Sequence, residues 1–145
     1  MRFIAGLVLS FLLCGICYAQ IVTVTVPTAN VRNSPSLEDS YVILEAPQNY
    51  PLSVQSQQDD FLEVRDFLGR RGWIQKSLVD EKADGVVVEV SSMNVRQGPG
   101  TDYPVVFRAE QGVAFKVVGQ KDGWLHVEHA SGKNGWVYKS LTWGQ

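Results

Sequence analysis

The chain has 145 residues, with 13 lysines and arginines against 15 aspartates and glutamates, so its net charge is −2. It contains no basic run or patch, which excludes the electrostatic footprint of a protein that binds nucleic acid or an anionic membrane surface. Hydrophobic residues make up 45% of the chain, a share that is typical of a globular protein rather than a disordered one.

The first 19 residues have the pattern of a secretory signal peptide. Arg2 supplies a basic start, an apolar run extends from Phe3 to Ile16, and Ala19 is a small residue at the position that a signal peptidase reads. We expect cleavage after Ala19, so that the exported protein begins at Gln20. An uncleaved membrane anchor is the alternative, but the run is shorter than the roughly 20 apolar residues of a spanning helix.

Cleavage would also remove both cysteines, Cys14 and Cys17. The exported chain would then have no disulfide, although its compartment permits one. Loss of Arg2 leaves 12 basic residues against 15 acidic ones.

Short β-strands are predicted in chain order after this segment. Val22, Val24 and Val26 alternate with threonines, which is the two-residue period of a strand. The further expected strands contain Ala29 and Val31, then Leu52 and Val54, then Leu62 and Val64, and finally Ile74. Turn residues separate these segments, and none shows a sustained helical period, so the sequence predicts a small antiparallel barrel of five short strands.

The second half of the chain repeats the first. MNVRQGPG (93–100) matches ANVRNSPS (29–36) at an offset of 64, and residues 120–141 match 57–78 at an offset of 63 with ten identities in 22 positions. One extra residue is therefore expected in the first copy, between about Ile43 and Gln48. The sequence predicts a signal peptide (1–19) and two domains, residues 20–82 and 83–145, each near the smallest size that folds alone.

The repeated motifs make the chain similar to the bacterial SH3 domain family (SH3b). Each copy has N-V-R followed by a proline turn (NVRNSP and NVRQGPGTDYPVV) and a later G-W motif before K-S-L (GWIQKSL and GWVYKSL), with DGWLHV in the second. The resemblance implies two tandem all-β SH3-like barrels, a long loop after N-V-R, and single 3₁₀ turns at 76–78 and 139–141. It also implies a non-catalytic module that targets cell-wall peptidoglycan.

The two proline turns are expected to differ. Pro99-Gly100 suits a type II turn, because glycine tolerates the positive φ of that turn, whereas Pro35-Ser36 favours type I.

No catalytic constellation can be read in the exported chain. It lacks cysteine, and its two histidines, His126 and His129, stand three residues apart near the end of a strand. Odd spacing on a strand sends side chains to opposite faces, which is poor geometry for a shared metal ion. The sequence therefore predicts that the protein is not an enzyme and has no cofactor or metal site.

Polar residues of the N-V-R motif lie on the outer face of their strand. We assign Asn30, Arg32, Asn94 and Arg96 a structural role, in which asparagine bonds loop backbone and arginine donates to a carboxylate or to carbonyls. A role in binding is the alternative.

The aromatic residues of the second copy mark the candidate site. Trp124 is out of phase with the core positions Leu125 and Val127, and Trp136 and Tyr138 flank the core position Val137. Outer positions on paired strands are neighbours. The expected ligand-binding residues are Trp124, Trp136 and Tyr138, with Tyr103 reaching in from the long loop; the first copy has Phe61, Trp73 and Gln75 at the matching strand positions, with Tyr41 near the match of Tyr103. Alternatively, these aromatics cover the barrel ends or pack between the copies.

Two functions fit these observations. The first is an exported module, periplasmic or extracellular, that recognises peptidoglycan or its peptides through the aromatic groove of the second copy. The second is a scaffold whose aromatics hold an extended, proline-containing peptide of another exported protein. We expect no nucleic-acid partner and no membrane span after cleavage.

Overall fold

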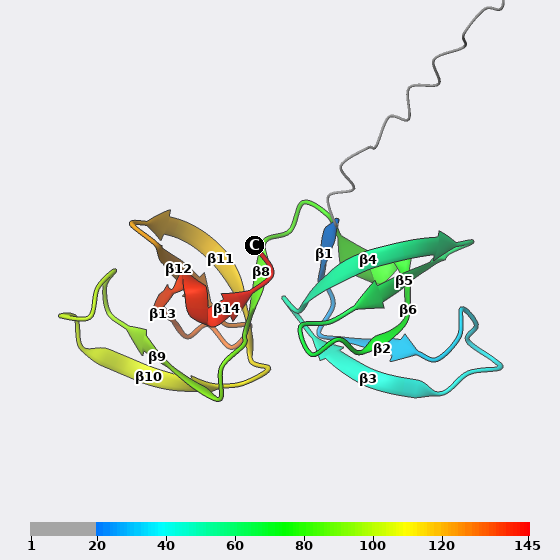
Figure 1. Ribbon diagram of the computed structural model, residues 1–145, viewed down its shortest axis with the longest axis horizontal. Coiled ribbons are helices and arrows are strands. Elements are labelled where there is room, and N and C mark those ends of the chain that lie inside the picture. Colours follow the sequence, from blue (N-terminus) through cyan, green and yellow to red (C-terminus); the bar gives the residue numbers. More distant parts are fainter. Residues whose placement is uncertain (1–19) are drawn as a thin grey trace, which may run out of the picture.

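The computed structural model describes residues 20–145, which form two seven-stranded antiparallel sheets (Figure 1). The all-β fold predicted from the sequence is confirmed. The expected signal peptide, residues 1–19, lies outside the described residues. From residue 20 onwards, no helix has both the length and the apolar character needed to cross a membrane.

The first sheet contains strands β1 to β7. Their bounds are β1 Ile21–Val24, β2 Thr28–Arg32, β3 Val42–Pro47, β4 Pro51–Gln58, β5 Phe61–Arg65, β6 Arg71–Gln75 and β7 Val79–Asp80. The strand order across the sheet is β3-β2-β6-β5-β4-β1-β7, and every pair is antiparallel.

The second sheet repeats this order as β10-β9-β13-β12-β11-β8-β14. Its strands are β8 Gly85–Val88, β9 Ser92–Arg96, β10 Val105–Glu110, β11 Ala114–Lys121, β12 Trp124–Glu128, β13 Asn134–Tyr138 and β14 Thr142–Trp143. The two expected 3₁₀ turns are present as η1 (Lys76–Leu78) and η2 (Lys139–Leu141).

Each barrel is filled by the side chains that the two-residue period sends inward. In the second sheet Leu125, Val127 and Val137 are completely buried, as predicted. Burial of each such aliphatic side chain contributes about 1.5–3 kcal/mol to stability.

The sequence did not predict two of the seven strands in each copy. The two-residue strands β7 and β14 are too short to show alternation, and β3 and β10 occupy the second half of what we expected to be loop. Both strands are interrupted by a β-bulge, at Ile43 in β3 and at Val106 in β10. A bulge adds one residue to one strand and breaks the alternation of buried and exposed positions. Only four residues of regular alternation follow the bulge in each strand, which is too short a pattern to identify the strand in the sequence.

The register of these strands also corrects the position of the extra residue in the first copy. Arg32 pairs with Val42, and Arg96 pairs with Val105. The loop between the paired strands therefore has nine residues in the first copy (33–41) and eight in the second (97–104). The extra residue lies in the loop, and not between Ile43 and Gln48.

Both loops begin with the same three-residue turn, so the expected difference between them is wrong. The amide of Ser36 donates to the carbonyl of Ser34, and the amide of Gly100 donates to the carbonyl of Gly98, each at 2.9 Å. Gly100 does not have the positive φ of a type II turn. A proline at the centre, whose φ is fixed near −65°, suits an inverse γ-turn of this kind.

A glycine at the start of each G-W motif lets two strands approach closely. A Cβ atom on Gly135 would lie 2.6 Å from Val95 Cγ1 and 2.8 Å from the carbonyl oxygen of Arg96. A Cβ atom on Gly72 would meet Val31 and Arg32 at the same distances. The N-V-R and G-W motifs are therefore two halves of one packing contact.

The two sheets share part of a core. Val87 and Ala114 belong to the second sheet, yet they are buried in the hydrophobic cluster of the first, and Trp143 packs against that cluster. From the first sheet, Thr23 is 1% exposed and its hydroxyl donates to the carbonyl of Ala83 at 2.9 Å. Strand β8 is thus buried on both faces, with Val86 and Val88 in its own core.

Candidate binding groove

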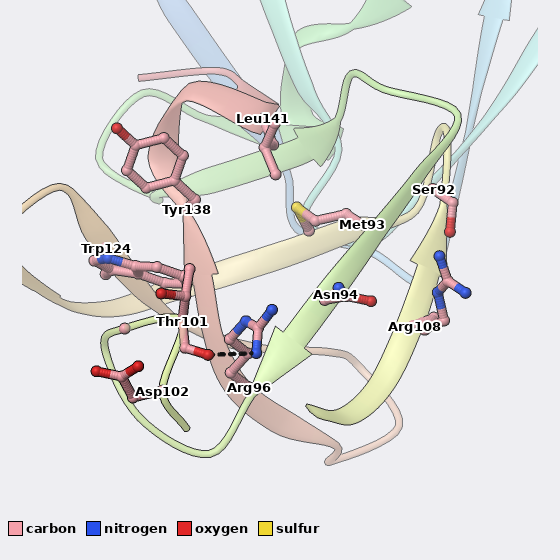
Figure 2. A pocket seen from close by; sticks show the side chains of 11 residues that line it. Ser92, Met93, Asn94, Arg96, Thr101, Asp102, Arg108, Trp124, Tyr138 and Leu141 are labelled. Carbon is pink, nitrogen blue, oxygen red and sulfur yellow. Dashed lines mark hydrogen bonds between the residues drawn. The ribbon is translucent and has the colours of Figure 1, made fainter. Parts of the chain in front are cut away.

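A hollow of about 550 Å³ opens on the outer face of the second sheet (Figure 2). Strands β9, β10, β12 and β13, the loop of residues 97–104 and η2 all contribute to it. The lining residues are Ser92, Met93, Asn94, Arg96, Gly100, Thr101, Asp102, Arg108, Trp124, Tyr138 and Leu141. We call this hollow the groove.

An aromatic pair forms one side of the groove. Trp124 and Tyr138 are directly opposite each other in β12 and β13, and their ring centroids are 5.4 Å apart at an interplanar angle of 53°. Tyr138 is 46% exposed, whereas Trp124 is half-buried. The sequence placed both side chains on this face because each follows or precedes a core position in its strand.

The other two aromatic residues that we expected in the site lie beside the groove rather than in its lining. Trp136 is on the same outer face, where it stacks on His126 with ring centroids 4.7 Å apart and an interplanar angle of 7°. The ring of Tyr103 lies against Gly98 within the loop. His129 packs edge-on against Phe115, so the two histidines have different partners.

Arg96 holds the loop that borders the groove. Its Nη1 donates to the carbonyl of Thr101 at 3.0 Å and to the carbonyl of Tyr103 at 2.9 Å, which confirms the predicted structural role of this arginine. The equivalent Arg32 donates instead to the hydroxyl of Ser40 at 3.2 Å. Because only one side-chain nitrogen of Arg96 is used on the loop, its other donors remain available to the groove.

The asparagines behave differently from the expectation. Asn94 is in register with Arg108 across the β9–β10 pair and lines the groove. In the first copy the asparagine that bonds loop backbone is Asn33, whose Oδ1 accepts from the amide of Tyr41 at 2.9 Å.

Arg108 is one of the groove residues that the sequence did not predict. It is an exposed side chain on β10, the strand whose bulge hides its period. Its partner across the strands, Asn94, was the available signal, because opposite positions share a face.

The two arginines that line the groove, Arg96 and Arg108, form no ion pair within the described residues. The ion pair found within residues 20–145 joins Arg70 to Asp66 at 2.7 Å, in the first sheet. Figure 2 shows Arg96, Asn94 and Arg108 following one another, with Trp124 and Asp102 to the other side.

The corresponding face of the first sheet has different chemistry. Phe61 and Gln75 are paired where the second sheet has Trp124 and Tyr138. Glu45, paired with Asn30, takes the place of Arg108, and Glu63 takes the place of His126. At these two positions the first copy has glutamates where the second has Arg108 and His126, while the arginine of the N-V-R motif is present in both copies.

A buried carboxylate closes the β5–β6 turn of the first sheet. Asp66 accepts from the hydroxyl of Tyr50 at 3.1 Å, from Nε of Arg70 at 2.7 Å, and from the amides of Leu68 and Arg70. Burial, and then the negative charge of Asp66, raise the pKa of Tyr50 well above its ordinary range. The hydrogen bond to Asp66 likewise raises the pKa of Arg70. This network anchors a turn and lies outside the groove.

Comparison with known proteins gives the same twofold division. A family model described as a bacterial SH3 domain matches residues 25–81 and again residues 89–144. Over 121 residues the chain is 27% identical to a Bacillus subtilis protein provisionally named an N-acetylmuramoyl-L-alanine amidase, a match that covers 74% of this chain and 22% of that protein.

Shorter matches connect the chain to proteins named as cell wall amidases. It is 36% identical over 62 residues to one from Staphylococcus epidermidis, covering 42% of this chain and 21% of the relative. It is 33% identical over 54 residues to one from Staphylococcus aureus, covering 37% and 19%. The chain therefore spans only about a fifth of the length of these relatives.

Among solved structures, NlpC1 from Trichomonas vaginalis aligns with 88% of this chain and 46% of its own at 15% identity and a TM-score of 0.39. NlpC2 from the same organism gives 14% identity and the same score. This likeness is too weak to carry an argument.

Proposed function

The chain belongs to the bacterial SH3 domain family, and on that basis we propose that it is a non-catalytic binding module of the cell envelope that recognises peptidoglycan or its peptides. We take its two units as residues 20–82 and 83–145. Its location would be outside the cytoplasm, in keeping with the signal peptide that the sequence predicts.

The relatives support a role at the cell wall. Three of them are named as amidases, two of these as amidases of the cell wall, and each is several times longer than the segment that matches. A segment that recurs as a small part of such proteins has the character of an accessory unit. This supports a role for the matched segment in binding the cell wall, and not in the cleavage reaction of the amidases.

The groove of the second sheet is the observation that carries the proposal. Ligand sites combine an apolar, often aromatic, surface with a few polar groups that fix orientation. Trp124 and Tyr138 supply the aromatic surface, while Asn94, Arg96 and Arg108 supply the polar groups. An exposed pair of large aromatic rings is also the usual anchor of a binding surface.

Retention on purified cell-wall sacculi tests the proposal. We expect the wild-type protein to sediment with sacculi, and the double variant W124A/Y138A to lose at least tenfold in affinity, on the order of 2 kcal/mol for anchor residues. The variant Q75A, at the position of the first sheet that matches Tyr138, is the control. A wild-type protein that stays in the supernatant would refute the proposal.

An exposed apolar surface on the first sheet favours the second candidate function, a scaffold for another exported protein. Leu37, Tyr41, Val42 and Ile43 are exposed by 37–66% and lie on the long loop and on β3, the edge strand of its sheet. An edge strand can take on an extended peptide as an additional strand. This function predicts that Y41A weakens binding to the partner and leaves sacculus binding unchanged.

A further inference from the structure

We propose that the groove of the second sheet selects short peptides that end in a free carboxylate, and that Arg108, supported by Arg96, holds that carboxylate. This inference rests on the proposed function, because it assigns the carboxylate to the stem peptides of peptidoglycan. It goes further in naming the chemical group that is recognised and the residues that recognise it.

The first step concerns charge. Within residues 20–145, Arg108 and Arg96 form no ion pair, although both line the same groove. A guanidinium group presents parallel N–H donors that match the two oxygens of a carboxylate. Arg108 is exposed and none of its donors has a partner inside the described part of the chain, so its whole fork can turn to a ligand.

The second step concerns position. Asn94 is opposite Arg108, and Arg96 is two residues further along β9, so all three side chains leave the same face of the sheet. The amide of Asn94 adds a donor between the two guanidinium groups (Figure 2). A carboxylate at this point would receive hydrogen bonds from two strands at once.

The third step concerns the rest of the ligand. The aromatic pair of Trp124 and Tyr138 provides an apolar surface next to these donors. Asp102 is the one carboxylate in the lining, and it lies toward Trp124 and away from Arg108 (Figure 2). The groove therefore has a basic and an acidic side, and a peptide would lie with its carboxylate directed away from Asp102.

The first copy supplies an internal comparison. Glu45 stands at the position of Arg108, and a glutamate there would repel a carboxylate. Gln75 also replaces Tyr138 at the aromatic pair. We therefore assign carboxylate binding to the second sheet alone.

The experiment compares a carboxylate with its neutral amide in the exported two-sheet protein. The probes are diacetyl-Lys-D-Ala-D-Ala and its C-terminal carboxamide, titrated while the indole N–H signals are followed by NMR. We expect the acid to bind about tenfold more tightly than the amide, because a hydrogen bond to a charged group contributes roughly this factor. Because Arg108 is exposed, the preference should shrink as salt is raised.

Variants at Arg108 assign the preference to that residue. R108Q should bind acid and amide equally, and R108K should keep only part of the preference, because lysine lacks the fork. R71Q removes an exposed arginine from the first sheet and should change nothing. A preference that survives in R108Q would overturn the assignment.

The remaining outcomes separate this inference from the proposed function. Equal binding of acid and amide, with sacculus retention intact, would overturn the carboxylate inference alone. Equal binding of diacetyl-Lys-L-Ala-L-Ala and the D-isomer would overturn the stem-peptide source and indicate a protein C-terminus. Absence of binding to both probes and to sacculi would overturn the inference and the proposed function together.

Discussion

Trp124 and Leu125 are adjacent in β12, yet one side chain borders the groove and the other is completely buried. We predict that L125A loses roughly 2–5 kcal/mol of stability through lost burial and a cavity. W124A should lose much less, because its ring is only half-buried and pairs with the exposed ring of Tyr138. Thermal unfolding of both variants measures the difference; equal losses would mean that Trp124 belongs to the core and not to a binding surface.

The glycine of the G-W motif is a second residue whose role is steric. In G135A the added methyl would press on Val95 and on the backbone of Arg96, so we predict a loss of about 1–3 kcal/mol from overpacking. G119A is a matched control in the same sheet, since its Cβ would lie at an acceptable 3.4 Å from His126. Chemical denaturation should show a clear shift of the midpoint for G135A only.

Tyr50 gives the protein a predictable response to alkaline pH. Its pKa is raised in the folded state by burial and by Asp66, whereas in the unfolded chain it is near its ordinary value of about 10. The neutral hydroxyl of Tyr50 therefore makes its full contribution to the free energy of unfolding below about pH 10. This contribution falls as the pH rises above that value. We predict that Y50F flattens this alkaline decline in unfolding free energy. Y138F, at an exposed tyrosine, should leave the decline as steep as in the wild type.

For single residues, the sequence predicted which face of a strand a side chain occupies, but it did not predict which residues that side chain contacts. Alternation placed Trp124, Tyr138 and Leu125 correctly, because a strand has only two faces. It could not show that Tyr103 folds back on Gly98, or that Trp136 stacks on His126. Those contacts depend on the path of a loop and on which strands pair, and neither follows from a local period.

Among the structural elements, the loop of residues 97–104 receives its side-chain hydrogen bonds from one residue, Arg96. Arg96 donates to the carbonyls of Thr101 and Tyr103, and nearby Thr101 and Asp102 line the groove. We predict that R96Q increases amide exchange in this loop while changing global stability by less than about 1 kcal/mol. Hydrogen exchange read by mass spectrometry measures this. In R108Q the loop should exchange as in the wild type, since Arg108 makes no such bond; an unchanged loop in R96Q would contradict the anchoring role.

The regular strands and the 3₁₀ turns were predictable from the sequence, whereas the bulged strands and the geometry of the proline turns were not. The strands around Leu62 and Leu125 are recognised by the alternation of apolar and polar residues. The K-S-L turns follow from the family resemblance. The sequence does not predict β3 and β10, because the bulge at the second residue of each strand leaves only four residues of regular alternation. The bulge is at the same position in both copies, so it does not explain the misplaced extra residue of the first copy. The offset changes from 64 to 63 within the loop of residues 33–41, where the two copies have too few identities to locate the change.

For the whole molecule, the important feature is the core that the two sheets share. Val87 belongs to β8 but packs in the cluster of the first sheet, where it is completely buried. We predict a single cooperative unfolding transition, with far-UV circular dichroism and tryptophan fluorescence changing together. V87A should lower the midpoint of that one transition, whereas V118A, at a side chain that is 46% exposed, should not. Two separate transitions would show that the shared contacts are too weak to couple the sheets.

The repeat predicted two copies but could not predict how they meet. Thr23 alternates with the core valines of its strand, yet it is 1% exposed and its hydroxyl donates to the carbonyl of Ala83 in the second copy. The alternation of residues in a strand identifies a buried face and an outer face. It does not show that another domain packs on the outer face.

The two long loops lie at opposite ends of the longest dimension of the molecule (Figure 1). The two sheets share a core and are not joined only by a flexible linker. The fold therefore sets the distance between the two loops. The two-sheet protein would therefore act as a rigid spacer. A ligand bound at the loop of residues 97–104 would leave the loop of residues 33–41 accessible at the other end of the protein. A second ligand bound there would be held at a fixed distance from the first.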